Sequence, residues 1–220
     1  MKWYWKIAIG FVSLIVLVLL LNISLNLWIK YQLPKIINEQ NDSAYAITYK
    51  KLKVSLLDSN ISADDIVIVP KAALKDNHSK AGIYAKVRSV EINHFKLWAL
   101  IFDNKIKAQS VSVNRPEFIL YKKNDKAINN SKSIRSSVVA PFEKIISVPD
   151  IFLHHGTLKI VYVKNNRVIL DVKDIELTLN GIIITEDILK EKIPFYFKDY
   201  SLSCNDIYYH PNQFYNIRSQ

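Results

Sequence analysis

The feature that most constrains this chain is an uncharged apolar segment at its N-terminus. Residues 1–30 read MKWYWKIAIGFVSLIVLVLLLNISLNLWIK, and no residue from Ile7 to Ile29 carries a charge. At about 1.5 Å rise per residue, a helix of this length spans the roughly 30 Å hydrocarbon core of a membrane. Trp and Tyr residues flank both ends, as they do at membrane interfaces. We therefore predict one transmembrane anchor, with its apolar surface formed by Ile7, Phe11, Leu14, Leu17, Leu20, Leu25 and Trp28.

A cleaved signal peptide is the alternative for this segment. It would need a short apolar core followed by small residues at the cleavage site. The chain instead continues after Leu21 with bulky residues, in NISLNLWIKYQLPKII, which favours an uncleaved anchor. Lysines lie on both sides of the span, so the positive-inside rule discriminates weakly. The very short N-terminal tail favours a cytoplasmic N-terminus, which places the remaining chain across the membrane. In a diderm bacterium that compartment is the periplasm.

Beyond the span, apolar and polar residues alternate in the manner of half-buried β-strands. Tyr45, Ile47 and Tyr49 share one face of a first strand. Near the other end of the chain, LDVKDIELTLNG places Ile175, Leu177 and Leu179 on one face. The abundance of Ile, Val, Tyr and Phe supports a mainly β fold.

A few residues predict the local structure between strands. The stretch 165–167, NNR, is a candidate hairpin turn because Asn tolerates positive φ. Pro116 indicates an edge strand, a bulge or a strand start, because Pro cannot donate to a sheet ladder. TEDILKEK, capped by Thr185, is a candidate short helix.

The domain organisation follows from these patterns. We predict a tail and transmembrane anchor over residues 1–32 and one β-domain over residues 33–220. The region from Lys122 to Lys144 is rich in Lys, Asn and Ser without a clear period, which is typical of an exposed insertion. Residues 54–74 and 97–121 share an order of apolar cluster, polar turn with Asp and Asn, strand and Pro, which suggests repeated strand units. The last residues, QFYNIRSQ, resemble a strand being entered, so we expect the N-terminal part of a longer protein.

The adjacent histidines His154 and His155 are the first candidates for chemistry. Neighbouring side chains of a strand point to opposite faces, so the two rings are not expected to grip one metal ion. No HxxxH, HxH or CxxC spacing occurs. We interpret the pair as the end of a strand that leads into Gly156, and Asp64 and Asp65 as a solvated turn. Without a nucleophile or nucleotide-binding motif, the sequence predicts no enzyme, no cofactor and no metal site.

The formal charge of +10 raises the alternative of nucleic-acid binding. The lysines are spread along the chain, however, and the aromatic residues occur at strand periodicity or beside the span. A solvated basic surface is the simpler interpretation. We therefore expect no nucleic-acid partner.

The apolar cluster FKLWALIFDN, from Phe95 to Asn104, has two interpretations. It could pack as a helical turn against the sheet, which we favour because most apolar clusters belong to a core. It could instead contact lipid, together with the strand face described above. The candidate lipid-facing residues are Leu97, Trp98, Leu100, Ile101, Ile175, Leu177 and Leu179.

Two stretches, LWALIFDNKIKAQSVSVNRPEFILY and IFLHHGTLKIVYVKNNRVILDVKDIELTLNG, follow an order of apolar cluster, turn and strands within residues 45–181. In these stretches the chain resembles the AsmA-like family of bacterial envelope proteins. The positions that carry the likeness are Pro116, Gly156, Leu158, Val172, Ile175, Leu177 and Leu179. The polar insertion departs from the family pattern, and the chain is short for a bridge across the periplasm.

The resemblance implies an inner-membrane protein with a curved, groove-like antiparallel sheet built from repeats. It implies phospholipid transport between the two membranes, or outer-membrane assembly and homeostasis, with membrane phospholipid as the partner and without catalytic residues. Alternating strands with few covering helices agree with an apolar face that could hold acyl chains. The alternative function is an anchored scaffold that binds envelope proteins through sheet edges.

Overall fold

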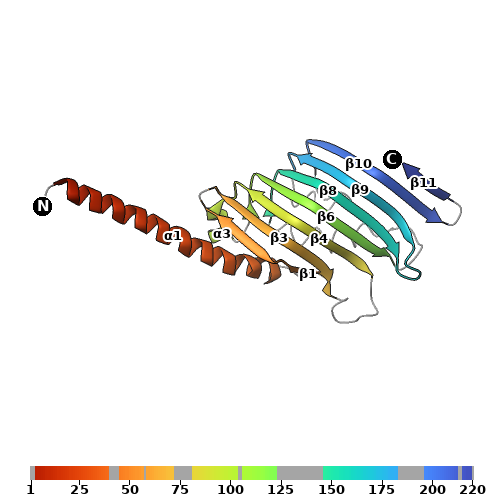
Figure 1. The fold of residues 1–220 in the computed structure, drawn as a ribbon, viewed down its shortest axis with the longest axis horizontal. Coiled ribbons are helices and arrows are strands. Elements are labelled where there is room, and N and C mark those ends of the chain that lie inside the picture. Colours follow the sequence, from red (N-terminus) through yellow and green to blue (C-terminus); the bar gives the residue numbers. More distant parts are fainter. Residues whose placement is uncertain are drawn as a thin grey trace.

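The structure is a computed structural model that describes residues 3–39, 45–56, 58–71, 81–103, 106–122, 146–182, 196–212 and 215–219. Its N-terminal helix α1 runs from Trp3 to Glu39 and projects away from the rest of the molecule as a rod (Figure 1). Within α1, the stretch Phe11–Gln32 has a mean hydropathy of 2.4 and is long and apolar enough to cross a membrane. By length and composition, it is consistent with a single-pass anchor or with a signal sequence.

The remainder of the described chain is mainly β, as the alternation predicts. Besides α1 it contains one helix of more than one turn, α3 (Leu97–Phe102). The strands are β1 (Tyr45–Thr48), β2 (Lys51–Ser55), β3 (Asn60–Pro70), β4 (Gly82–Asn93), β5 (Ile106–Lys107), β6 (Ser110–Lys122), β7 (Ile146–Ser147), β8 (Asp150–Tyr162), β9 (Val168–Asn180), β10 (Asp199–Asn212) and β11 (Tyr215–Ser219).

Nine of these strands form one curved sheet in the order β1-β3-β4-β6-β8-β9-β10-β11, with β2 also paired to β3 (Figure 1). The sheet is mostly antiparallel, as predicted, but β6 and β8 are parallel, and so are the short strands β5 and β7. Parallel neighbours need a long crossover connection. Part of this connection is the predicted polar insertion, which lies outside the described residues beyond Lys122. The candidate helix at Thr185 also lies outside them.

The six long strands present one continuous apolar face. Residues paired across a sheet point to the same side, so the register assigns each side chain to a face. From β3 to β10, five successive rows of paired residues are almost entirely apolar, and we call them the apolar face. On β8 and β9 these residues are Ile151, Leu153, Gly156, Leu158, Ile160 and Leu179, Leu177, Ile175, Val172, Leu170. On β4, β6 and β10 they are Ile92, Val90, Val87, Ala85, Ile83; Val111, Val113, Pro116, Phe118, Leu120; and Tyr200, Leu202, Cys204, Ile207, Tyr209.

The alternation is interrupted once in each of these strands, and the interruptions line up across the sheet. At this place two consecutive residues, instead of one, separate neighbouring members of the apolar face. In β3, β6, β8, β9 and β10 one residue of the pair has a left-handed backbone: Asp65 (φ 52°), Arg115 (φ 47°), His155 (φ 54°), Asp174 (φ 50°) and Asp206 (φ 48°). We call this line the crease. A single left-handed residue shifts the alternation, so the apolar residues on both sides of the crease stay on one face.

Pro116 shows how the crease accommodates a residue that a central strand normally excludes. It is buried inside β6 between β4 and β8, so it lies neither at an edge nor at a strand start. The pairing of β6 with β8 is interrupted at Arg115, immediately before Pro116. Of the edge, bulge and strand start that were predicted, this setting is closest to the bulge. The turn predicted at 165–167 is confirmed as part of the β8–β9 hairpin, with Asn166 at φ 53°.

A compact core covers one end of the apolar face. It combines α1, α3 and the ends of several strands, and we call it the end cluster. Its buried members are Ile29, Val54, Ile61, Phe95, Leu100, Ala108 and Val148, with Leu52, Leu56, Ile92, Leu97 and Val111 packed against them. Because Ile61, Ile92 and Val111 belong to the apolar face, the end cluster buries that face where β3, β4 and β6 meet α3.

Candidate functional site

The first candidate site is the part of the apolar face that the end cluster leaves bare. The predicted residues Ile175, Leu177 and Leu179 all lie on it, in β9. Exposure increases toward β10, where Tyr200 is 62% and Leu202 is 60% exposed. Among the described elements, none forms a second layer over β8, β9 and β10 (Figure 1). This half of the face therefore offers a wide apolar surface from a single-layered sheet.

The predicted residues of α3 are divided between core and surface. Leu100 is 1% exposed in the end cluster and Leu97 packs against it, in agreement with the core interpretation of this segment. Ile101 is half-buried. Trp98, by contrast, is 69% exposed, and Phe102 one turn later is 72% exposed. A short helix thus buries one side and leaves an aromatic pair on the other.

The predicted anchor residues lie along α1. The side chains of Phe11, Leu14, Leu17 and Leu20 are all exposed, as expected for a surface that no protein covers. Leu25 is half-buried, and Trp28 is at the margin of exposure. Ile7 lies in the helix backbone, and its side chain is outside the described set.

The C-terminal part of α1 is joined to the β-domain. The side-chain amide of Asn26 donates a hydrogen bond of 2.7 Å to the carbonyl oxygen of Val54 in β2. One turn later, Ile29 is fully buried in the end cluster. The helix that could cross a membrane is therefore fixed to the sheet by a polar contact and an apolar one.

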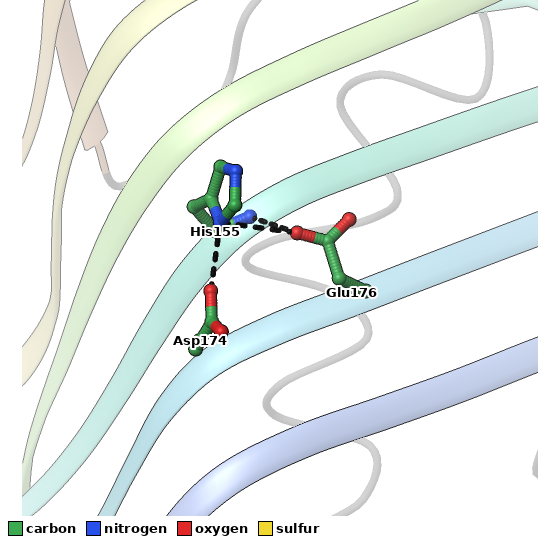
Figure 2. A group of neighbouring side chains, drawn as sticks. All are labelled: His155, Asp174 and Glu176. Atoms are coloured by element: carbon green, nitrogen blue, oxygen red, sulfur yellow. Dashed lines mark hydrogen bonds and ion pairs between the residues drawn. The ribbon is translucent and has the colours of Figure 1, made fainter.

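A second candidate site lies on the opposite, polar face, where His154 and His155 meet two carboxylates of β9. Figure 2 shows three of these residues, His155, Asp174 and Glu176. The Nδ1 atom of His154 lies 2.8 Å from Oε2 of Glu176, and Nδ1 of His155 lies 2.7 Å from Oδ1 of Asp174. The backbone N–H of His155 donates to Oε1 of Glu176 at 2.8 Å. We call these four residues the histidine–carboxylate cluster.

This geometry corrects two expectations about the histidines. They lie inside β8, not at the end of a strand. Their side chains also do not point to opposite faces. The left-handed φ of His155 breaks the alternation, and Nδ1 of each ring lies within 3.3 Å of a carboxylate oxygen of Glu176. Asp64 and Asp65 are corrected in the same way. They lie within β3, where Asp65 is on the crease and pairs with Lys50 at 3.3 Å.

The cluster is electrostatically paired but open to solvent. Its hydrogen bond to the His155 side chain lowers the pKa of Asp174, and the backbone N–H of His155 lowers the pKa of Glu176. Potential ligand atoms of His155, Asp174 and Glu176 lie within 4.8 Å of one another, which is close enough to hold a metal ion. In the arrangement seen here these groups satisfy each other. The chemistry they display is hydrogen bonding between β8 and β9 at the crease, on the face that does not carry the apolar residues.

Sequence reasoning overlooked a signal for the crease. Each long strand carries a polar doublet where strict alternation would allow only one polar residue. The doublets are Asp64-Asp65, Arg88-Ser89, Asn114-Arg115, His154-His155, Lys173-Asp174 and Asn205-Asp206. Several are joined across strands: Asn114 to Ser89, Asn205 to Asp174, and Lys173 to Asp206. The HH pair is one member of this series.

A scan against protein-family models finds no matching family. A search of curated proteins likewise returns no match. What the structure itself shows is an N-terminal apolar helix followed by a large, mixed but mostly antiparallel sheet.

Proposed function

We propose that this chain is an inner-membrane-anchored, AsmA-like envelope protein that carries phospholipid on its apolar face. In this proposal α1 is the anchor, with its N-terminus in the cytoplasm and the β-domain in the periplasm of a diderm bacterium. The observation that supports it best is the five-row apolar face, which is maintained across the crease in all six long strands. Exposed apolar surfaces of this extent on a soluble domain usually bind a partner.

The dimensions of the face suit acyl chains. Neighbouring strands are about 4.8 Å apart, so β3 and β10 are separated by roughly 24 Å across the sheet. One leaflet of a membrane has a hydrocarbon depth of about 15 Å, half of the roughly 30 Å core. An acyl chain could thus lie across several strands without leaving the apolar rows. The polar face, with its ion pairs, would stay in water.

An anchored scaffold is the second candidate, and β11 is the observation that favours it. Among the described strands, β11 pairs with β10 alone, and all five of its residues are exposed. Its outer backbone groups could pair with a strand of another protein. A scaffold would use that edge and would not require the face of β8–β10 to hold lipid.

The decisive experiment is native mass spectrometry with lipid extraction on the full chain purified from membranes. The full chain is needed because α1 packs into the end cluster. Leu177 and Leu202 are paired on the apolar face, whereas Thr178 and Ser201 are paired next to them on the polar face. The variant with Leu177→Asp and Leu202→Asp should lose copurified phospholipid. The matched control with Thr178→Asp and Ser201→Asp adds the same two facing carboxylates, but on the polar face. It should therefore retain the phospholipid.

Phospholipid that copurifies with the natural chain and exchanges with liposomes supports transport. If the natural chain contains no lipid, or if both variants lose it equally, lipid carriage is wrong and the edge-binding scaffold becomes the better account.

A further inference from the structure

We propose that α3 is a second membrane contact, in which Trp98 and Phe102 lie in the headgroup region beside the anchor. This inference rests on the proposed role of α1 as a membrane anchor. It adds to that role a fixed placement of the β-domain against the bilayer. The occupant of this surface is the membrane from which α1 emerges.

The first argument is the shared core of α1 and α3. Ile29 of α1 and Leu100 of α3 belong to the same end cluster and are 0% and 1% exposed. Figure 1 shows α3 beside the C-terminal part of α1, with the N-terminal part of α1 projecting beyond the sheet. Since both helices pack into one rigid core, the depth of α1 in the membrane fixes the depth of α3.

The second argument is the position of the membrane boundary along α1. From Ile7, where the uncharged run begins, to Asn26 an α-helix rises by about 28 Å, which is close to the hydrocarbon thickness. Asn22, Ser24 and Asn26 are polar residues in the last part of this stretch, after the apolar run of residues 14–21. Ile29 lies only about 5 Å farther along the helix than Asn26. The end cluster is thus placed at headgroup depth, and α3 with it.

The third argument is the character of the exposed side of α3. The rings of Trp98 and Phe102 are stacked, with centroids 5.6 Å apart and an interplanar angle of 13°. Aromatic side chains of this kind concentrate at membrane interfaces. Lys96 before the helix and Lys30 on α1 are exposed and can meet lipid phosphates. Asp103, at the end of α3, is paired with Lys107 at 3.4 Å, so its charge is already compensated.

The placement has a consequence for the apolar face. The row of Ile151, Leu179 and Tyr200 lies at the same strand ends as Ile61 and Ile92, which the end cluster covers. The bare half of the face therefore starts beside the proposed membrane contact. An acyl chain that leaves the bilayer at α3 would meet this row first.

Trp98 itself is the probe that tests the contact. The chain has four tryptophans, and the variant with Trp3→Phe, Trp5→Phe and Trp28→Phe leaves Trp98 as the only one. The full chain is reconstituted into vesicles of phosphatidylcholine brominated on its acyl chains, with phosphatidylglycerol, and its fluorescence is compared with that in unbrominated vesicles. We expect blue-shifted emission from Trp98 and loss of most of its intensity in the brominated lipid.

Two controls set the scale. A chain with Trp28 alone should be quenched, because this residue lies on α1 near the boundary. A chain with Lys86→Trp as the only tryptophan should stay unquenched, because Lys86 is exposed on the polar face beyond the crease. If Trp98 fluoresces like the Lys86→Trp probe in chains that float with the vesicles, the contact is refuted. If the chain does not float with the vesicles, membrane anchoring by α1 is wrong, and the contact of α3 that rests on it is wrong too.

The lipid-extraction experiment is independent of this one. Quenched Trp98 in a chain that retains no phospholipid would overturn the transport function and leave the membrane contact established.

Discussion

The two halves of the apolar face differ in what covers them. Near β3, β4 and β6, the end cluster buries Ile61 to 2% exposure and packs against Ile92 and Val111. Near β9 and β10, the same rows continue with Leu177, Leu179 and Leu202, and Leu202 remains 60% exposed. The strands of both halves have the same alternation. The difference is that, among the described elements, α1, α3 and the short strands pack onto the first half and none packs onto the second.

This contrast separates two uses of one pattern. In the covered half, apolar residues stabilise the domain and hold α1 to it. In the bare half they contribute less to stability, because within the described part of the chain Leu177 and Leu179 are only half-buried and Leu202 is exposed. A residue of the bare half is therefore better explained by a bound partner than by folding, which is the basis of the proposed lipid carriage.

Truncating one leucine in each half should give the largest difference. Leu100→Ala removes a fully buried side chain from the end cluster and should lower the free energy of unfolding by about 2–5 kcal/mol. Leu202→Ala removes an exposed side chain and should change it by less than about 0.5 kcal/mol. Denaturant unfolding of the full chain in detergent, followed by circular dichroism, measures both. Equal losses would show that the bare half is packed as tightly as the covered half.

A substitution at the boundary between the halves should have an intermediate effect. A Cβ atom on Gly156 would lie 2.6 Å from Cδ2 of Leu153 and 3.4 Å from atoms of Ile175 and Pro116. Gly156→Val should therefore destabilise the domain by about 1–3 kcal/mol through overpacking at the crease. Adding Leu153→Ala removes the closest atom, so the double variant should lose less stability than the sum of the two single variants. Strict additivity in the same unfolding assay would contradict this packing.

The smallest effect is expected on the polar face. The folded-state pKa values of Asp174 and Glu176 are lowered, so their stabilising contribution is present above the unfolded-state pKa of about 4. It is lost as the pH falls through the lowered values. The variant with Asp174→Asn and Glu176→Gln should thus be slightly less stable than the natural chain at pH 7 and equal to it in strong acid. A thermal-unfolding series over pH measures this convergence, and a difference that grows on acidification would have the wrong sign.

Much of the fold follows from local patterns that the sequence displays directly. The apolar run predicts α1, and alternation predicts a mainly β domain and the common face of Ile175, Leu177 and Leu179. The parallel pairing of β6 with β8 could not be predicted, because it depends on the path of the connection between them. The division of α3 into buried Leu100 and exposed Trp98 likewise depends on tertiary contacts, since both residues belong to one apolar cluster.

The crease explains why the prediction for the histidines was wrong. Strict alternation puts His154 and His155 on opposite faces, and the argument against a shared partner was based on that rule. The left-handed φ of His155 breaks strict alternation at this place, so the rule does not apply there. Left-handed φ is uncommon for residues other than Gly, and Asn and Asp adopt it more readily than most. A comparison of the polar doublets between strands would have predicted the crease from the sequence.

The central claim is that the apolar face, and not the polar one, binds phospholipid in the membrane-embedded full chain. Leu177 and Thr178 are neighbours in β9 whose side chains point to opposite faces. A benzophenone amino acid placed at each position in turn, and photolysed in membranes, tests the claim most directly. The account predicts a phospholipid adduct from position 177 and none from position 178, detected by mass spectrometry. Adducts of equal yield from both positions, or protein adducts alone from position 177, would contradict it.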